Sequence, residues 1–376
     1  MAKRAILEVS EGQAEVALRA FLKQLLDNNV VEALLVPQVV EGGKNVAQGL
    51  VTAGDSLDRA DPLAPVMPVN SARIVSAMTK KSPPSRKMAI VLRPCELRAL
   101  VELVKLKQAS LENIVTIGVD CFGTYSMNKY AEKAASSSSA TQEFLNKASE
   151  GNGDADLRMV CQICEYPVPL TSDLTIGLVG LDANKGILVE ANTPAGEEAL
   201  EKLGLGGGDE LAQKREAAVS RLLADRRKKA EEFLEQTRKE VSGLDKLVSI
   251  FSTCITCHNC RTACPICYCK ECFFDSPTFE MEADKYLRQA DKRGAIKMPT
   301  DTLLFHITRM NHMGVSCVGC GSCEEACPND IPVAKLFRLV GADLQKLFEY
   351  VPGRSLDDEL PLTTFREEEL TQVVED

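Results

Sequence analysis

The first 120 residues alternate between short apolar runs and stretches with helical periodicity. Residues 13–26 carry apolar side chains three and four positions apart, which predicts an amphipathic helix. Residues 87–94 form a continuous apolar run, residues 95–107 return to helical spacing, and residues 113–120 form a second run. Because parallel strands buried on both faces are apolar throughout, this order predicts a strand–helix–strand unit of an α/β domain.

Further apolar and charged stretches extend this domain. Residues 30–40 are predicted to form a strand, in which Pro37 favours an edge position or a break. Residues 174–180 and 186–192 are apolar and lie close together in the chain, so a pair of neighbouring strands is expected. Residues 209–241 have opposite charges four positions apart, which indicates a long, solvated connecting helix and not a basic binding surface.

The pattern changes from residue 245 on, where two cysteine-rich runs are separated by helix-like segments. These segments are residues 280–293 and 300–314. In the second segment, four apolar side chains share one face of the predicted helix. They are Leu303, Leu304, Ile307 and Met310.

The chain has 376 residues, enough for two or three domains with separate cores. Its net charge of −10, its lack of tryptophan and its aromatic content of 5% argue against nucleic acid or an anionic membrane as a partner. No apolar run approaches the roughly 18 residues of a membrane span, and the first residues lack the apolar segment of a secretion signal. A cytoplasmic location is therefore expected.

The fifteen cysteines indicate a metalloprotein, because a reducing compartment favours metal ligands over disulfides. Eight of them form two runs of the same spacing, CxxCxxCxxxCP. In such paired runs, three cysteines bind one [4Fe–4S] cluster and the fourth binds the other. The predicted ligands of the first cluster are Cys254, Cys257, Cys260 and Cys327. Those of the second cluster are Cys317, Cys320, Cys323 and Cys264.

Structural zinc and disulfides are the alternatives for these eight cysteines. Zinc sites are built from two CxxC-type pairs with four ligands in all, which two four-cysteine runs fit poorly. The helical segments between the runs favour an α-helical ferredoxin module. Gly319 and Gly321 give the second run the freedom to point backbone N–H groups at cluster sulfurs.

Four of the remaining cysteines are arranged around the predicted parallel strands. Cys95 and Cys121 each follow such a strand directly, so both are expected at the carboxyl edge of the sheet, where open α/β sheets bind ligands. Cys161 and Cys164 add a CxxC pair. The four thiols could form a third four-cysteine centre. Alternatively, Cys95 and Cys121 are small buried apolar residues.

Three cysteines directly follow the first run: Cys267, Cys269 and Cys272. They could belong to a fourth centre, Cys267 could replace Cys264 as a ligand, or all three could pack beneath the second cluster. The packing interpretation is favoured. The three histidines lie outside the repeated spacing and are assigned no role. They are His258, His306 and His312.

Three stretches resemble the beta-subunit family of coenzyme F420-dependent hydrogenases and dehydrogenases. They are LRPCELRAL (92–100), IGVDCFGTY (117–125) and CQICEYPVPLTSDLTIGLVG (161–180), and the resemblance extends over roughly residues 10–205. With the segment CPICYCKECFF, the C-terminal module is similar to the beta subunit of F420-type formate dehydrogenases. The resemblance implies FAD beside a third [4Fe–4S] cluster, with coenzyme F420 as substrate. The implied ligands of that cluster are Cys95, Cys121, Cys161 and Cys164.

Two segments depart from the family pattern. Residues 11–13 read EGQ where SGG is expected, and residues 181–186 read LDANKG where relatives carry a Gly-Trp segment. Both lie where the family would hold a flavin or deazaflavin.

The expected fold is an α/β flavin-type N-terminal domain followed by an α-helical ferredoxin-type 4Fe–4S dicluster domain. The predicted parts are an F420-dehydrogenase-beta-like flavin and iron–sulfur domain at 1–205, a charged connecting helix at 206–244, the dicluster domain at 245–345 and an acidic tail at 346–376.

Two functions are compatible with this layout. In the first, the chain is an oxidoreductase: the beta subunit of a formate dehydrogenase or hydrogenase complex, which passes electrons through [4Fe–4S] clusters to FAD and a soluble two-electron carrier such as coenzyme F420. In the second, it is a non-catalytic adaptor that connects such a dehydrogenase to a heterodisulfide-reductase-type flavoprotein. No stretch is typical of a site that activates formate or hydrogen, so the primary substrate is expected to react on a partner subunit.

Overall fold

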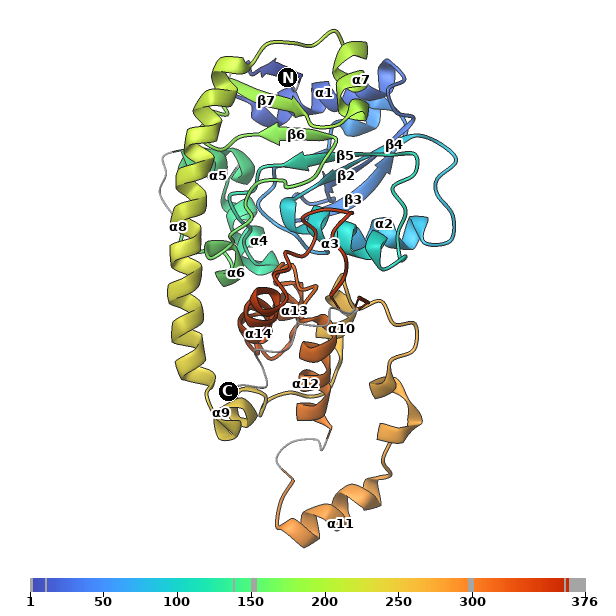
Figure 1. Ribbon diagram of the computed structural model, residues 1–376, viewed down its shortest axis with the longest axis vertical. Helices are drawn as coiled ribbons and strands as arrows, with labels where there is room; N and C mark the ends of the chain where they lie inside the picture. Colours follow the sequence, from blue (N-terminus) through green and yellow to red (C-terminus); the bar gives the residue numbers. More distant parts are fainter. Residues whose placement is uncertain are drawn as a thin grey trace. The chain divides into compact units, whose positions relative to one another are not determined.

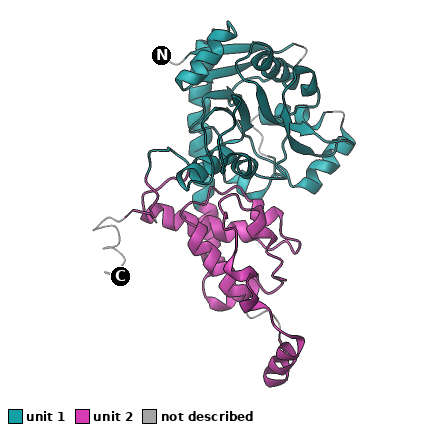
Figure 2. Cartoon of the chain, turned by 90° about the vertical axis from the view of Figure 1, so that its right-hand side faces the viewer, with its two compact units in different colours: residues 1–231, 353–358 teal, residues 232–352, 359–376 magenta. Residues whose placement is uncertain are grey.

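The chain divides into two compact units (Figure 2). The computed structural model describes residues 3–10, 12–137, 139–149, 154–296, 301–361 and 363–364. Unit 1 comprises residues 1–231 and 353–358, and unit 2 comprises residues 232–352 and 359–376. The division falls inside helix α8 (Asp209–Val241), which begins in unit 1 and ends in unit 2.

Unit 1 is built on one seven-stranded sheet with the order β1-β7-β6-β5-β4-β2-β3 (Figure 1). The strands are β1 (Arg4–Glu8), β2 (Ala33–Val39), β3 (Val46–Val51), β4 (Met88–Leu92), β5 (Ile114–Val119), β6 (Leu174–Gly177) and β7 (Gly186–Ala191). The central strands β2, β4, β5 and β6 run parallel, whereas β3, β7 and β1 pair antiparallel towards the two edges. The parallel strands therefore end at one common carboxyl edge.

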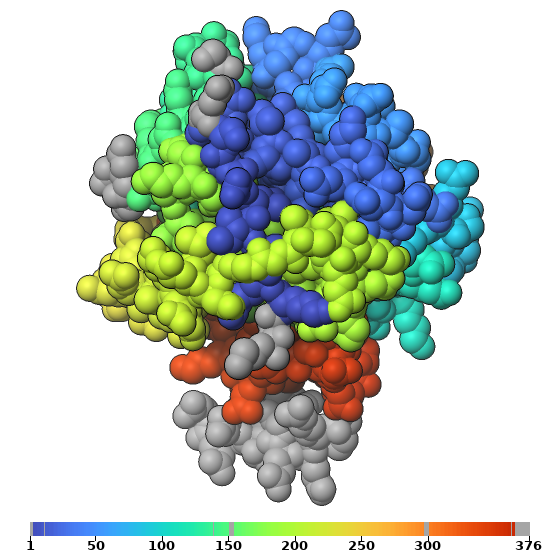
Figure 3. Space-filling model, turned by 90° about the horizontal axis from the view of Figure 1, so that it is seen from above, coloured from blue at the N-terminus to red at the C-terminus, as the bar shows by residue number. Residues whose placement is uncertain are grey.

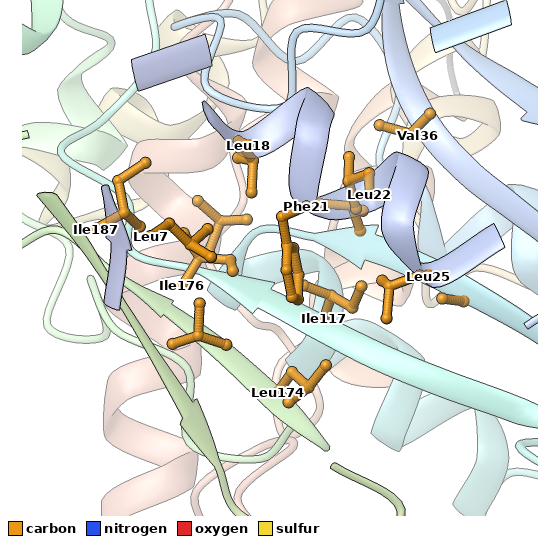
Figure 4. Packing of buried hydrophobic residues seen from close by; sticks show 14 of the residues in the cluster. Leu7, Leu18, Phe21, Leu22, Leu25, Val36, Ile117, Leu174, Ile176 and Ile187 are labelled. Carbon is orange, nitrogen blue, oxygen red and sulfur yellow. The ribbon is translucent and has the colours of Figure 1, made fainter. Parts of the chain in front are cut away.

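Helices cover both faces of this sheet. They are α1 (Ala14–Asp27), α2 (Ala72–Thr79), α3 (Pro94–Lys105), α4 (Met127–Ser136), α5 (Ala140–Ser149), α6 (Met159–Gln162) and α7 (Pro194–Lys202), with the 3-10 turn η1 (Gly54–Leu57). On one face, Phe21 and Leu25 of α1 pack towards Ile117 and Leu174 (Figure 4). On the other face, α3 lies so close to β5 that a Cβ on Gly118 would be 2.8 Å from its nearest side-chain atom in α3, Cδ1 of Leu97.

The strand–helix–strand unit predicted from residues 87–120 is confirmed as β4, α3 and β5. The predicted helix at 13–26 and the predicted strand pair are confirmed as α1 and as β6 with β7. Strand β2 runs unbroken through Pro37 and lies between β3 and β4, so neither a break nor an edge strand is found; at Pro37 only the side facing β3 is paired. Pairing of β2 with β4 covers only Ala33 to Leu35, so the missing N–H of Pro37 leaves no gap in that ladder.

The N-terminal strand is fixed to the segments around α7. Lys3 forms an ion pair with Glu201, and Arg4 pairs with Asp209 at 3.2 Å. Viewed from above, the N-terminal residues in blue accordingly lie beside the yellow-green residues of α7 and the start of α8 (Figure 3).

The first half of α8 packs on unit 1, so the predicted solvated connector is wrong for this part. Arg215 donates to both oxygens of Asp120, at 2.6 and 3.0 Å, and Asp120 also accepts from the N–H groups of Leu178 and Val179. A Cβ on Gly177 would lie 2.6 Å from Nε of Arg215, so only glycine leaves room for this side chain. Arg215 makes this contact, and Ala212 and Leu211 pack beside it, so much of the contact is polar.

Unit 2 is helical. Its helices are the end of α8, α9 (Leu244–Ile250), α10 (Asn259–Ala263), α11 (Ala283–Arg293), α12 (Thr302–Met313), α13 (Ser322–Glu325) and α14 (Val333–Leu347), with the 3-10 turns η2 (Phe273–Asp275) and η3 (Pro277–Phe279). Among the described residues, no helix is both long and apolar enough to cross a bilayer.

The buried face of α12 differs from the predicted leucine face. Leu304 and Ile307 are 51% and 43% exposed, whereas Phe305, His306 and Arg309 are buried. The helix turns these polar side chains inward because thiols, and not leucines, occupy the space that it faces.

After α14 the chain returns to unit 1. Gly353 has a left-handed φ of 71°, and a Cβ there would collide with the backbone of Arg98 in α3. Its N–H donates to Oε1 of Glu102 at 2.8 Å. Residues 365–376 of the predicted acidic tail lie outside the described residues.

Candidate metal centres

The two cysteine runs of unit 2 fold into loops of the same conformation. In the first loop, Thr256 and His258 have left-handed φ angles of 52° and 57°. In the second loop, Gly319 and Gly321 occupy the equivalent positions with φ angles of 69° and 72°. Each loop then enters a short helix, α10 or α13. The repeat in the sequence is therefore also a repeat of backbone structure.

These left-handed residues direct backbone N–H groups towards the thiols. The N–H of Thr256 lies 3.4 Å from Sγ of Cys254. The N–H of Gly319 makes the equivalent hydrogen bond to Cys317. Successive N–H groups on one side of a turn form a concave surface that favours anions, including the sulfurs of iron–sulfur sites.

Each loop contributes to a cavity lined by four cysteines. One cavity encloses about 340 Å³, partly open to solvent, and the other about 440 Å³. The first is lined by Cys254, Cys257, Cys260 and Cys327. The second is lined by Cys317, Cys320, Cys323 and Cys264. The structure thus brings together the two predicted sets, with the fourth cysteine of each run in the cavity of the other. Their metal binding stays a prediction.

The thiols of the two cavities are not arranged as a site for a single ion. Within the described ranges, no three or more His, Cys, Asp or Glu side chains are arranged to hold one metal ion. All fifteen cysteines lie in those ranges, and none forms a disulfide. A zinc ion requires ligand sulfurs at about 2.3 Å from one centre, whereas the thiolates of a [4Fe–4S] cluster each bind a different iron. The cavities therefore fit a four-iron cluster better than zinc.

Burial favours the protonated form of several of these thiols. It raises the pKa of Cys260 and of Cys317 to about 11, and that of Cys323 well above its ordinary value. Only the thiolate binds a metal, so cluster insertion must release protons. The negative charge that this creates in the cavities then has to be balanced by buried donors and cations.

Two polar side chains of α12 reach the thiols. Arg309, 4% exposed, donates from Nη1 to Sγ of Cys260 at 3.1 Å and from Nη2 to the carbonyl oxygen of the same residue at 3.1 Å. Nε2 of His306 lies 3.4 Å from Sγ of Cys254, and its ring stacks on Phe251 with centroids 3.9 Å apart. Burial lowers the pKa of His306 to about 3, so the ring is neutral. In the Nε2–H tautomer it donates to the thiol.

Sequence reasoning missed the contacts that both side chains of α12 make with the thiols. The available signal was a histidine and an arginine three positions apart on a helix between two cysteine runs. His258 lines the first cavity and bonds to Asp275 at 2.8 Å, while His312 is exposed.

The three cysteines after the first run do not line either cavity. Cys272 packs against the group formed by Cys260, Phe274 and Phe305, and Cys269 is exposed. Burial raises the pKa of Cys267 to about 11. The contacts of Cys272 agree with a packing role near the first cavity, whereas the sequence placed it beneath the second.

In unit 1, Cys95 and Cys121 lie at the carboxyl edge of β4 and β5. Cys95 is in the first turn of α3, and Cys121 directly follows Asp120 at the end of β5. Arg93 is 8% exposed, and its Nη1 lies 3.6 Å from Sγ of Cys121. Burial alone would lower the pKa of Arg93, but the charges of Cys121, Glu96 and Cys95 raise it. This guanidinium is therefore placed to balance thiolates.

Backbone hydrogen bonds join the segment around Cys161 and Cys164 to the segment around Cys121. The N–H of Cys121 donates to the carbonyl of Pro167 at 2.8 Å, and the N–H of Arg158 donates to the carbonyl of Thr124 at 3.0 Å. Although burial alone would raise the pKa of Cys161, the Arg158 guanidinium and the Thr124 hydroxyl lower it. The structure thus joins the segment of Cys161 and Cys164 to that of Cys121. A third cluster on the four cysteines of unit 1 stays a prediction.

A large pocket adjoins these segments at the carboxyl end of β6. It encloses about 1400 Å³ and is open to solvent. Its apolar lining includes Phe122, Phe144, Leu157, Leu178, Val179, Leu181 and Leu222. Its charged lining is Lys147, Asp154, Asp225, Arg226 and Lys229. Arg226 of α8 also donates to the carbonyl oxygens of Cys161 and Phe122, so one side chain links the pocket to both cysteine segments.

An α/β unit with a cysteine-bearing sheet edge, followed by a helical unit with two four-cysteine cavities, defines an iron–sulfur electron-transfer protein. Residues 85–213 match the family described as the C terminus of the coenzyme F420 hydrogenase/dehydrogenase beta subunit. Residues 250–331 match the 4Fe–4S dicluster domain. The chain thus matches both families, which confirms the resemblance predicted from its sequence and the predicted order of an α/β domain and a dicluster domain.

Two relatives match nearly the whole chain. The F420-dependent formate dehydrogenase subunit beta of Methanocaldococcus jannaschii is 27% identical over 378 residues, which cover 92% of this chain and 93% of the relative. The F420-dependent formate dehydrogenase 1 subunit beta of Methanococcus maripaludis is 28% identical over 399 residues, covering 95% and 94%. These relatives confirm the predicted class, an oxidoreductase subunit of the beta type.

A chain in a solved structure, titled as a xenon derivatization of the F420-reducing [NiFe] hydrogenase complex from Methanosarcina barkeri, aligns more weakly. The alignment covers 65% of this chain and 94% of that chain, at 13% identity and a TM-score of 0.42. The likeness is too distant to bear on fold or function.

The two loops should respond differently to exchange of their left-handed residues. In Gly319→Thr, the new Cβ would lie 2.8 Å from Cδ of the buried Arg338, and the residue would be held at φ 69°. We expect this variant to lose about half of the dicluster iron. Thr256→Gly removes a left-handed β-branched residue that costs about 1–2 kcal/mol, so it should retain full iron. Iron and acid-labile sulfide assays on oxygen-free protein compare each variant with wild type. Full iron in Gly319→Thr would contradict the argument.

Proposed function

We propose that this chain is the electron-transfer beta subunit of a formate dehydrogenase or hydrogenase complex, with two [4Fe–4S] clusters in unit 2, and a third cluster and FAD in unit 1. The observation that carries this proposal is the pair of cavities in unit 2, each lined by three cysteines of one run and one of the other. When bound, the clusters supply one-electron transfer and the flavin supplies two-electron exchange with a soluble carrier such as coenzyme F420.

The residues of unit 2 fit two cubane clusters in donor type, number and surroundings. Each cavity offers four thiols, backbone N–H donors from the left-handed turns, and an apolar wall that limits contact with water. The apolar side chains include Ile255, Phe305, Ile331 and Val333 in the first cavity, and Ile266, Val318 and Phe337 in the second.

The residues of unit 1 fit a third cluster in charge and position. The four thiols belong to Cys95, Cys121, Cys161 and Cys164. Arg93 and Arg158 lie beside Cys121 and Cys161, so each guanidinium favours the thiolate that iron binds. The parallel strands bring Cys95 and Cys121 to the same sheet edge.

The pocket next to these cysteines suits a dinucleotide such as FAD. Its volume and its apolar walls provide room and contact area for a flavin ring. Arg226 and Lys229, one helical turn apart on α8, provide positive charge for the pyrophosphate, although Lys229 is also paired with Asp225 of the same lining at 2.8 Å. Because Arg226 also bonds to the carbonyl of Cys161, a flavin held here would lie close to the third cluster.

The primary substrate would react on a partner subunit. The relatives are named as beta subunits of formate dehydrogenases, which supports formate as the electron source of the complex. The described part of this chain offers cysteine-lined cavities and one large pocket beside a cysteine pair, which suits the transfer of electrons away from such a partner.

One observation favours the alternative, a non-catalytic adaptor to a heterodisulfide-reductase-type flavoprotein. The two segments that depart from the family pattern meet, because a Cβ on Gly12 would lie 3.5 Å from Oδ1 of Asn184. Asn184 is hydrogen-bonded to Gln142 at 2.6 Å and to Asn146 at 3.1 Å. Because these polar groups are hydrogen-bonded to one another, they are less able to bind a deazaflavin.

The crossed ligand sets can be tested one cysteine at a time. Cys327→Ser should alter the electron paramagnetic resonance signal of the cluster held by Cys254, Cys257 and Cys260, and Cys264→Ser should alter the other signal. Cys269→Ser is the matched control, since Cys269 is exposed and lines neither cavity. If Cys327→Ser and Cys264→Ser changed the same signal, the crossed arrangement would be refuted.

The pocket can be tested by flavin retention. Lys229→Met should weaken flavin binding roughly tenfold, because a charge-assisted hydrogen bond contributes about 1.5–3 kcal/mol. Arg226→Met should weaken it at least as much and should also disturb the third cluster through Cys161. Arg221→Met, an exposed position on the same helix, is the control. Unchanged flavin content and affinity in both pocket variants would place the flavin elsewhere.

The two functions differ in what the full chain does with a reduced deazaflavin. For the subunit function, anaerobically purified protein should contain flavin, and reduced coenzyme F420 should bleach the flavin absorbance. Bound flavin that does not respond would instead support the adaptor. Protein that has iron but never retains flavin would overturn the flavoprotein part of the proposal.

A further inference from the structure

Arg309 is a buried cation whose charge is not balanced by any described carboxylate. Its side chain lies between the rings of Phe305 and Phe337, with Cζ 5.5 and 4.9 Å from the ring centroids. Its Nη1 and Nη2 bond to Cys260, and its buried Nε has no hydrogen-bond partner. A cation removed from water in this way needs a negative charge nearby.

The groups placed to supply that charge are thiols from both cavities. Arg309 bonds to Sγ of Cys260 in the first cavity and itself lines the second cavity beside Cys264 and Cys323. Cluster insertion requires these ligands as thiolates, so bound clusters would bring negative charge to both cavities that the guanidinium of Arg309 reaches.

His306 provides the contrast within the same helix. It is neutral and contacts Cys254 of the first cavity only. His306 therefore contacts a thiol of one cavity, whereas Arg309, one turn further along α12, reaches both cavities.

We propose that Arg309 is the shared counter-ion of the two clusters of unit 2 and sets the reduction potentials of both. This inference rests on the proposed dicluster. Reduction adds one negative charge to a cluster, and a fixed positive charge in a low-dielectric site stabilises the reduced form. Because one guanidinium acts on both clusters, it raises both potentials together. Arg309 is thus a positioning residue that acts through the cysteine ligands.

The experiment is a potentiometric titration of the anaerobically reconstituted full chain, followed by electron paramagnetic resonance. Arg309→Gln keeps a hydrogen-bond donor and removes the charge. It should shift the reduction equilibrium of both clusters at least tenfold towards the oxidised form, which is about 59 mV for a one-electron couple. Arg309→Lys keeps the charge and should shift both clusters less. His306→Phe should shift only the cluster of the first cavity.

Arg288→Met is the charge-matched control, because it removes one exposed cation on α11 and should leave both potentials unchanged. If Arg309→Gln loses iron, the same titration is made on Arg309→Met, which removes the charge and keeps a long side chain; lower potentials than wild type in both clusters support the proposal, and unchanged potentials overturn it. Arg309→Gln with full iron and unchanged potentials, or with only one potential shifted, also overturns it. Wild-type protein with fewer than about eight iron atoms in unit 2 would instead refute the dicluster itself.

Discussion

The exchange of the fourth cysteine between the two runs is the constraint on which the rest of unit 2 depends. Neither run can complete a four-thiol cavity alone, because Cys264 lies with the second set and Cys327 with the first. The chain between the runs must therefore fold back so that α10 and α13 meet. Any metal bound in these cavities would join residues more than fifty positions apart in the sequence, so that cluster insertion and folding of this unit become one process.

Arginine is the common solution to the charge problem that this arrangement creates. In unit 2, Arg309 contacts a thiol directly, and in unit 1 Arg93 and Arg158 do so. A guanidinium keeps its charge when buried, whereas an ammonium loses it more readily, so arginine remains an effective partner for thiolates in a dry site. Thiol chemistry and buried cations therefore occur together in both units, although their folds are unrelated.

Spacing and periodicity predicted the parts of the structure that depend on local sequence. The cysteine spacing of the two runs predicted the grouping of thiols around both cavities, and the apolar runs predicted β4, α3 and β5. These signals are strong because a backbone turn or a buried strand imposes them residue by residue.

The parts that sequence reasoning missed depend on what a helix faces. Leu304 and Ile307 have the right spacing for a buried face of α12, but the surroundings of that helix are thiols, which select His306 and Arg309 instead. Similarly, α8 resembles a solvated connector because an arginine, Arg215, supplies much of its contact with the sheet unit, beside Ala212 and Leu211. Neither environment can be read from the helix itself.

The return of the chain to α3 has a further consequence for dissection of the protein. Gly353 inserts against Arg98 and donates to Glu102, so the α/β unit is closed by residues that follow the whole helical unit. The helical unit is in effect an insertion, and a chain terminated after α8 would leave Glu102 without this donor in a space shaped for a glycine.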